Sequence, residues 1–251
     1  MAQALLRPLL EAGLIDPQAV RAVVATRASA ERLSGSLQVA VGTEPAEAWA
    51  APVVLLAVKP QQLEVVAATV PPQASGLLLS VLAGVTVERL ERLFPAWHCV
   101  RAVPNTPALV RQGLTGLAWG AGVDGHQRRW VRTLFGQVGE VLELPEVQLD
   151  AFLALTSSGP AFVALVAEAL ADGAVAAGLP RTLAGPLTLR TVAGTAALLE
   201  QQRLHPAELK DMVSSPAGTT IAGLRALERG GLRSALIEAV LAAAERSRQL
   251  A

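Results

Sequence analysis

With 251 residues, the chain is long enough for one large domain or two smaller ones. Lys plus Arg and Asp plus Glu each number 21, so the chain lacks the basic excess of a nucleic-acid-binding protein or of a protein that adheres to anionic membranes. The one cysteine, Cys99, excludes an internal disulfide framework and fits a protein of the reducing cytoplasm.

Short apolar segments alternate with helical ones over the first 145 residues. Residues 2–12 are expected to form a helix and, with no basic n-region or cleavage site, not a signal peptide. The run 52–58, PVVLLAV, is typical of a parallel strand that is covered on both faces. Further strands are predicted at residues 21–26, 37–41, 76–82, 98–103, 114–119 and 140–144, with helices between most of them. This alternation predicts an α/β, Rossmann-like, doubly wound parallel sheet.

From Val147 onward the sequence contains no convincing strand. Helices are predicted at 148–178, 181–202, 206–212 and 219–250, with breaks at Pro160, Pro180 and Pro206. We therefore place a domain boundary near Pro145, with an α/β domain at 1–145 and an all-helical domain at 146–251.

Two of these helices, 161–177 and 186–199, are apolar on nearly all faces. Such helices must be buried from every side, which indicates a partner subunit. The most apolar window, 161–179, contains Glu168 and Asp172, which would be costly in a bilayer. We therefore predict a cytoplasmic protein without a membrane span.

A doubly wound nucleotide-binding domain normally begins with a strand, a G-x-G-x-x-G turn and a helix. Met1 lies at the start of that helix, so the first strand and its glycine turn are expected to be absent from this sequence. A literal G-x-G-x-x-G occurs at Gly120, Gly122 and Gly125, but it lies late in the sheet. Asp124 would also direct a carboxylate to the place of the pyrophosphate, so a plain strand-to-helix connection is predicted there.

The segment KDMVSSPAGTTIAGL, residues 210–224, is rich in small hydroxyl residues and leads into an apolar helix. Ala217 and Gly218 keep side-chain bulk away, so the N–H groups of the first helical turn can face a small anion. An ordinary Ser or Thr helix cap after a proline turn explains the same residues. Taken alone, the segment leaves both interpretations open.

Seven segments, in one order along the chain, give it a family resemblance. They are ERL (31–33), LAVKPQ (56–61), AGVT (83–86), RAVPNTPALV (101–110), SSGPAFV (157–163), EALADGAVAAGLPR (168–181) and KDMVSSPAGTTI (210–221). With them the chain resembles the pyrroline-5-carboxylate reductases. The resemblance implies reduction of 1-pyrroline-5-carboxylate, a cyclic imine carboxylate, to L-proline, the last step of proline biosynthesis.

The resemblance also implies which residues bind the substrate. The carboxylate would lie on backbone N–H groups around Ser215, Gly218 and Thr219, and the catalytic hydroxyl of Thr220 would lie near the ring nitrogen. Glu146 and Ser158 match positions close to the substrate, although Glu146 could instead cap a helix and Ser158 could belong to a simple helix kink.

The cofactor positions carry over in the same way, and NADPH is favoured with NADH possible. Arg27 follows the second strand, where a cation can accept the 2′-phosphate of NADP, although it could also be a solvated loop charge. The other positions that match the cofactor site are Ala57, Val58, Lys59, Pro60, Ala83 and Asn105. The histidines have no partners at metal spacing, so no metal site is predicted.

The resemblance implies that 1–145 is a dinucleotide-binding domain and that 146–251 is a dimerisation and substrate domain. It also implies a homodimer or a larger homo-oligomer such as a decamer. The chain departs from the family pattern at Ala217, where a second glycine is usual, and the extra methyl is expected to narrow the carboxylate pocket. One alternative is an inactive or regulatory relative that lacks the phosphate turn. Another is a hydroxy-acid dehydrogenase, but such enzymes need a lysine in the first helix of the second domain, and residues 148–178 contain none.

Overall fold

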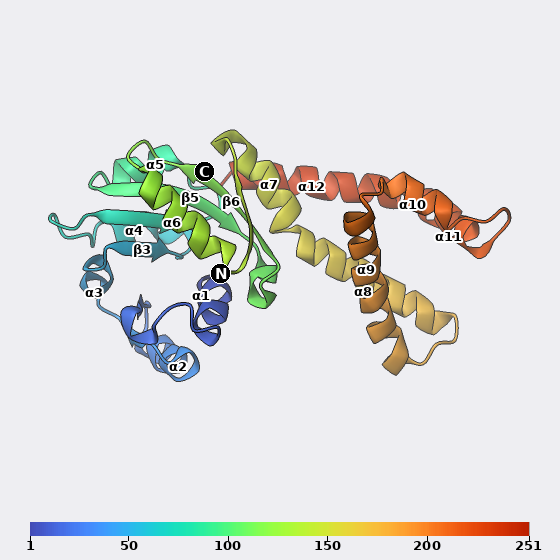
Figure 1. The fold of residues 1–251 in the computed structure, drawn as a ribbon, viewed down its shortest axis with the longest axis horizontal. Coiled ribbons are helices and arrows are strands. Elements are labelled where there is room, and N and C mark those ends of the chain that lie inside the picture. The colour runs from blue at the N-terminus through green and yellow to red at the C-terminus, as the bar shows by residue number, and fades with distance from the viewer. Residues whose placement is uncertain (251) are drawn as a thin grey trace. The chain divides into compact units, whose positions relative to one another are not determined.

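The computed structural model describes residues 1–250, and the chain folds into two compact units (Figure 1). The first unit comprises Met1–Ser157 together with the chain from Ala243 onward, and the second comprises Ser158–Ala242. The predicted boundary near Pro145 thus lies one short helix before the point at which the compact units divide.

The first unit contains a five-stranded sheet. In order, its strands are β3 (Val53–Leu56), β4 (Gly76–Ser80), β5 (Trp97–Pro104), β6 (Gly113–Trp119) and β7 (Gly139–Glu143). β3, β4 and β5 are parallel as predicted, whereas β6 runs antiparallel to β5 and β7 is parallel to β6. The reversal follows from the connection between β5 and β6, which holds only the short 3-10 helix η3 (Thr106–Val110) and is too short for a crossover.

A separate two-stranded parallel sheet is formed by β1 (Arg21–Val23) and β2 (Ala40–Gly42). In the doubly wound strand order the first strand lies between the second and the fourth. The second and fourth positions are taken here by β1 and β3, and within residues 1–250 no strand pairs with the outer edge of either one. The sheet is thus divided at the place of the first strand, and Leu55 in β3 is 37% exposed beside this break.

Helices cover both faces of the five-stranded sheet. Alternate residues of a strand point to opposite faces. Leu79 accordingly packs in one apolar cluster with helices α1 (Ala2–Glu11) and α6 (Gly125–Gly136), while Leu78 packs in another with α4 (Leu63–Ala67) and α5 (Val87–Leu93). In Figure 1, α6 lies over the sheet. The remaining helices of this unit are α2 (Arg27–Leu37), α3 (Pro45–Trp49), α7 (Leu149–Thr156) and the 3-10 turns η1 (Pro17–Ala19), η2 (Pro60–Gln62) and η4 (Glu146–Gln148).

Helices are the only regular elements among the described residues of the second unit. This unit contains α8 (Gly159–Ala176), α9 (Arg181–Gln202), α10 (Pro206–Met212), α11 (Thr219–Arg229) and most of α12 (Leu232–Arg248). The single helix predicted at 219–250 is wrong, because Gly230 and Gly231 interrupt it and Gly231 has a φ of +71°. The break expected at Pro160 falls at Ser157 and Ser158, and Pro160 occupies the first turn of α8, where its missing N–H costs nothing.

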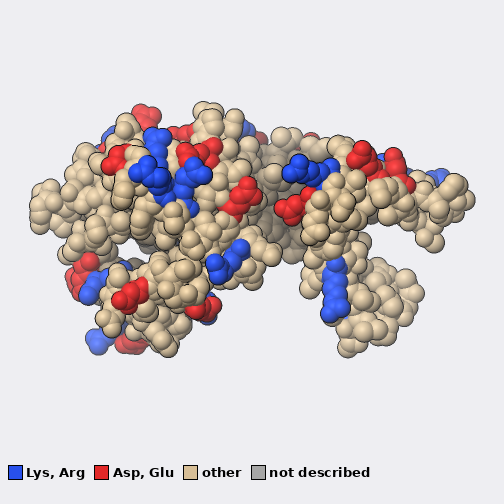
Figure 2. Space-filling view, viewed as in Figure 1, with Lys and Arg blue, Asp and Glu red and all other residues tan. Residues whose placement is uncertain are grey.

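Large aliphatic side chains cover much of the second unit's surface. Leu165 and Leu189 are 66% and 64% exposed, and Figure 2 shows wide uncharged areas over α8 and α9. The stretch Glu146–Ala176 is long and apolar enough to cross a membrane, with 17% of its most apolar window buried. It is nevertheless interrupted at Ser157, and Asp172 within it pairs with Arg181. Such a surface is typical of a subunit interface.

Candidate active site

Several predicted cofactor positions lie at one edge of the first unit's sheet. Residues 57–60 follow β3, Ala83 follows β4 and Asn105 follows β5, and these three strands are parallel. Ligands of open α/β sheets bind outside the carboxyl ends of the strands. At this edge Ala57 and Lys59 are exposed, Val58, Pro60 and Ala83 are half-buried, and Lys59 has no ion-pair partner among residues 1–250.

The turn that contains Ala83 is fixed by close packing and by a helix cap. Gly84 has a φ of +73°, and a Cβ atom there would approach the Cβ of Leu250 to 2.8 Å. Val85 is fully buried, and the hydroxyl of Thr86 caps α5 by accepting a hydrogen bond from the backbone N–H of Arg89 at 3.2 Å. Only glycine fits a left-handed position in such close contact.

Asn105 is buried and both ends of its amide are already engaged. Its Nδ2 donates to the carbonyl of Thr156 at 3.0 Å, and its Oδ1 accepts from the backbone N–H of Leu114 at 2.8 Å. The side chain therefore links the start of η3 to β6 and to α7 through hydrogen bonds. A cofactor contact at Asn105 stays a prediction and would involve its backbone unless one of these bonds were exchanged.

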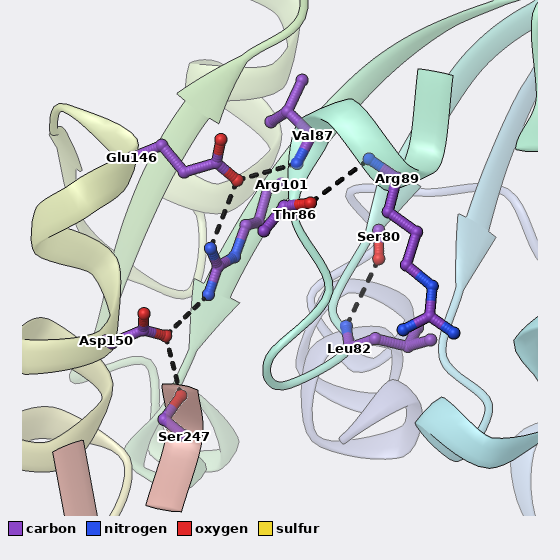
Figure 3. Close-up of polar contacts among 9 residues, drawn as sticks. All are labelled: Ser80, Leu82, Thr86, Val87, Arg89, Arg101, Glu146, Asp150 and Ser247. Atoms are coloured by element: carbon purple, nitrogen blue, oxygen red, sulfur yellow. Dashed lines mark hydrogen bonds and ion pairs between the residues drawn. The ribbon is translucent and has the colours of Figure 1, made fainter. Parts of the chain in front are cut away.

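Glu146 lies in a network of polar contacts (Figure 3). Its Oε1 accepts hydrogen bonds from the backbone N–H of Val87 at 2.7 Å and from Nη1 of Arg101 at 3.2 Å. Nη2 of Arg101 donates to Oδ1 of Asp150 at 3.0 Å, and that same oxygen accepts from the hydroxyl of Ser247 at 2.8 Å. Glu146 thus contacts the first turn of α5, not the helix that follows it in sequence.

Sequence reasoning missed Arg101, Asp150 and Ser247. One signal was available, because Arg101 interrupts the apolar run of β5, and a charge inside a buried strand requires paired counter-charges. Which carboxylates would meet it was decided by the fold.

Arg27 lies where a phosphate-binding cation was predicted. It is the first residue of α2, its side chain is 92% exposed, and within residues 1–250 it forms one ion pair, with Glu31 at 3.4 Å. An open hollow beside it is lined by Arg27, Ala30, Glu31, Ser34, Gly35, Val41, Gly42 and Thr43. The accessible cation suits a phosphate group, whereas the Glu31 carboxylate lines the same hollow and the N–H of Ser29 at this helix start already donates to the hydroxyl of Thr26 at 3.2 Å. A phosphate contact at Arg27 therefore stays a prediction.

The glycine motif at 120–125 does not fit a phosphate. Oδ1 of Asp124 accepts from the backbone N–H of Gln127 at 2.8 Å and completes a capping box at the start of α6. This backbone bond, more than the neighbouring His126, holds the pKa of Asp124 below its usual value, so an anion already occupies the helix start. A Cβ atom on Gly120 would meet Oε1 of Glu91 at 2.5 Å, which explains that glycine by packing. The motif is a plain strand-to-helix connection, as predicted.

The start of α11 is open by contrast. Its N-cap residue is Gly218, which has no side chain to cap the helix, and the first turn contains no acidic residue. The N–H of Gly218 donates to the carbonyl of Ser215 at 3.0 Å, whereas those of Thr219 and Thr220 have no partner within residues 1–250. Ser215 and Thr219 are exposed and Thr220 is half-buried. This helix start can hold a small anion beside two hydroxyl groups.

Ala217 has a φ of +56°, in the left-handed region. The cost of replacing the usual glycine is therefore backbone strain as well as the added methyl group. For a non-glycine residue this conformation is about 1–2 kcal/mol less favourable than a right-handed one.

We expect Ala217→Gly to increase the free energy of unfolding by about 0.5–1 kcal/mol, because the relief of strain exceeds the extra chain entropy of glycine. Denaturant unfolding measures this. The matched control is Ala222→Gly inside α11, which should lower stability by about 1 kcal/mol. Two changes of the same sign would contradict the assignment of strain to Ala217.

Ser158 is the N-cap residue of α8 and makes no side-chain cap bond. It belongs with Ser215, Gly218, Thr219 and Thr220 to the second unit, whereas Glu146 and the predicted cofactor positions belong to the first. Among residues 1–250 no group of three or more His, Cys, Asp or Glu residues could hold a metal ion. Burial, with a smaller effect of Glu91, raises the pKa of the Cys99 thiol to about 12, so this thiol is a core residue and not a nucleophile.

Two family models match the chain. The model described as pyrroline-5-carboxylate reductase dimerisation matches residues 146–250. The model described as NADP oxidoreductase coenzyme F420-dependent matches residues 1–84.

Whole-length relatives agree with these matches. A pyrroline-5-carboxylate reductase of Synechocystis sp. is 45% identical over 252 residues, which cover 100% of this chain and 94% of the relative. A pyrroline-5-carboxylate reductase structure from Coxiella burnetii shares 32% identity at a TM-score of 0.84, covering 100% of this chain and 94% of that one. The NADP-bound pyrroline carboxylate reductase of Plasmodium falciparum shares 27% identity at a TM-score of 0.91, covering 99% and 93%.

Proposed function

Since the chain belongs to the pyrroline-5-carboxylate reductase family, we propose that it reduces 1-pyrroline-5-carboxylate to L-proline with NAD(P)H. The observation that carries the proposal is the open start of α11. There the N–H groups of Thr219 and Thr220 have no partner within residues 1–250, and the hydroxyls of the same two residues lie beside them. A cyclic imine carboxylate presents one anion and one basic nitrogen, which match these two kinds of group.

In this proposal the substrate carboxylate binds at the first turn of α11. The N–H groups of Thr219 and Thr220 donate to it, and the hydroxyl of Ser215 lies beside the same turn. Gly218 contributes by lacking a side chain, because a Cβ atom there would meet Oγ of Ser215 at 2.3 Å. Ser158 and Glu146 are further substrate contacts that the family pattern assigns.

The hydroxyl of Thr220 orients the ring nitrogen. A bound nicotinamide cofactor would supply the hydride to the imine carbon, and the ring nitrogen takes its proton from water, because the imine can arrive already protonated. A hydroxyl is a weak acid at neutral pH, so Thr220 acts by hydrogen bonding and by holding the imine in place.

Cofactor contacts are proposed at residues 57–60, Ala83 and Asn105 on one sheet edge, and at Arg27. The exposed cation at Arg27 supports NADPH over NADH, since only NADPH carries a 2′-phosphate.

We expect Arg27→Gln to raise the KM for NADPH about 10-fold and to leave the KM for NADH unchanged, because one exposed charge contact to phosphate is lost. Steady-state kinetics with both cofactors measure this, and the difference should shrink as salt is added. Arg32→Gln, on the same helix, is the control. Equal changes for the two cofactors would contradict a 2′-phosphate contact.

The enzyme is a homo-oligomer, supported by the dimerisation match and by the exposed aliphatic side chains of the second unit. We propose a homodimer or a larger assembly such as a decamer, located in the cytoplasm, without nucleic-acid or membrane partners. The balanced charge supports the last point.

The direct test is oxidation of NADPH that depends on added pyrroline-5-carboxylate, with proline identified as the product. Absence of turnover both from this chain and from a chain extended at its N-terminus by a strand and a Gly-x-Gly-x-x-Gly turn would overturn the proposed activity.

A further inference from the structure

Arg101 is the one arginine that is almost fully buried among residues 1–250, with 2% of its side chain exposed. A buried charge is costly unless it is paired and hydrogen-bonded. Its two terminal nitrogens meet different carboxylates, those of Glu146 in η4 and Asp150 in α7. The guanidinium therefore joins β5 to both segments at once.

From Glu146 the network reaches the turn after β4. The oxygen that meets Arg101 also accepts the N–H of Val87, the first residue of α5. That N–H lies four residues after Ala83, which we propose as a cofactor contact. Glu146 therefore ties this turn to Arg101 (Figure 3).

A second connection approaches the same turn from the end of α12. Ser247 donates to the Asp150 oxygen that pairs with Arg101, and its own carbonyl lies 3.0 Å from a Cβ atom built on Gly84. Ser247 is 3% exposed. The connection through Glu146 thus reaches Val87, and the connection through Asp150 and Ser247 reaches Gly84, so the two meet opposite ends of the segment 84–87.

We propose that Arg101 is a positioning residue of the reductase site, which holds the turn 82–87 and Glu146 in place for hydride transfer. The inference rests on the proposed function. Nη1 and Nη2 of Arg101 donate to Glu146 and Asp150, while its buried Nε has no hydrogen-bond partner within residues 1–250. In this proposal Arg101 acts through the geometry of the turn. Lysine cannot replace it, because a single ammonium lacks the fork that reaches two carboxylates.

The test compares Arg101→Lys and Ser247→Ala with the parent chain. The control is Arg132→Lys, an exposed arginine of the same unit whose side chain is 57% exposed and pairs with Glu143. Ser247→Ala removes one hydroxyl and leaves the buried charges paired, so it should fold even where Arg101→Lys does not.

We expect kcat to fall about 10- to 100-fold in Arg101→Lys and by a smaller factor in Ser247→Ala, with the KM values for both substrates nearly unchanged. A misplaced turn disturbs the reacting geometry more than it disturbs binding. Amide hydrogen exchange of the segment 82–93 should become faster in both variants and stay unchanged in the control.

Turnover tests the proposed reductase activity, and amide hydrogen exchange tests the positioning role of Arg101. A parent chain without turnover in any form counts against the proposed activity, and hydrogen exchange still decides the role of Arg101. Unchanged exchange in residues 82–93, or a kcat that matches the parent in a folded variant, would overturn the positioning role.

Discussion

An N-terminal extension with one apolar strand and a Gly-x-Gly-x-x-Gly turn should increase the affinity of this chain for NADPH about 100-fold, or about 2.7 kcal/mol. The reason is the break between β1 and β3, where the outer edges of two strands have no partner among residues 1–250. The helix that would follow the turn, α1, has Met1 as its N-cap, no side-chain cap and no acidic residue in its first turn. Its free N–H groups can receive a pyrophosphate once the glycine turn precedes them.

The same extension should raise the melting temperature by several degrees, because an inserted strand pairs on two sides and covers Leu55. Binding is measured by NADPH fluorescence or calorimetry, and stability by thermal unfolding. The control has the same strand followed by a turn whose glycines are replaced by aspartates, which should stabilise the fold but not increase affinity. An extension that changes neither quantity would contradict the assignment of the break.

Replacing Thr220 by alanine is expected to lower kcat/KM for pyrroline-5-carboxylate about 10- to 100-fold, the value of one hydrogen bond made at the reacting nitrogen. The Thr220 hydroxyl has no partner within residues 1–250, so it is available to a ligand, and its removal should leave the melting temperature nearly unchanged. Thr220→Ser retains the hydroxyl and should recover most of the activity.

Thr191 provides the matched control for this measurement. It lies in α9 of the same unit, and its hydroxyl already donates to the carbonyl of Leu187 at 2.9 Å. Thr191→Ala should therefore leave kcat/KM unchanged. A Thr220→Ala variant as fast as its parent would remove the orienting role of Thr220 and leave the family assignment intact.

Features that depend on residues close to one another in the sequence were predictable from it. The apolar run at 52–58 indicated a strand covered on both faces, and β3 lies within it with helices on either side of its sheet. Apolar helices without a polar face predicted an interface, and their side chains remain exposed in the single chain. The segments 157–163 and 210–221 carried enough specific sequence to identify the family.

The sequence predicted a plain connection at 120–125 and left the start of the helix after Gly218 open between an anion site and a Ser or Thr cap. The structure shows no side-chain cap at that helix start, and anion binding there stays a prediction. Asp124 occupies the start of α6, while Gly218 leaves the start of α11 open. The strain at Ala217 likewise became visible only as a φ angle, because composition does not report backbone conformation.

By itself, the sequence determined the order of strands and helices, the helical second half and the family, since periodicity and motifs are local properties. The absence of the first strand was expected from the sequence, and the sheet is divided at its place. Only the tertiary structure decided the reversal of β6 and the network around Arg101. The partners in that network are 45, 49 and 97 residues apart in the chain. Contacts at such separations depend on how layers pack, and packing is a property of the whole fold.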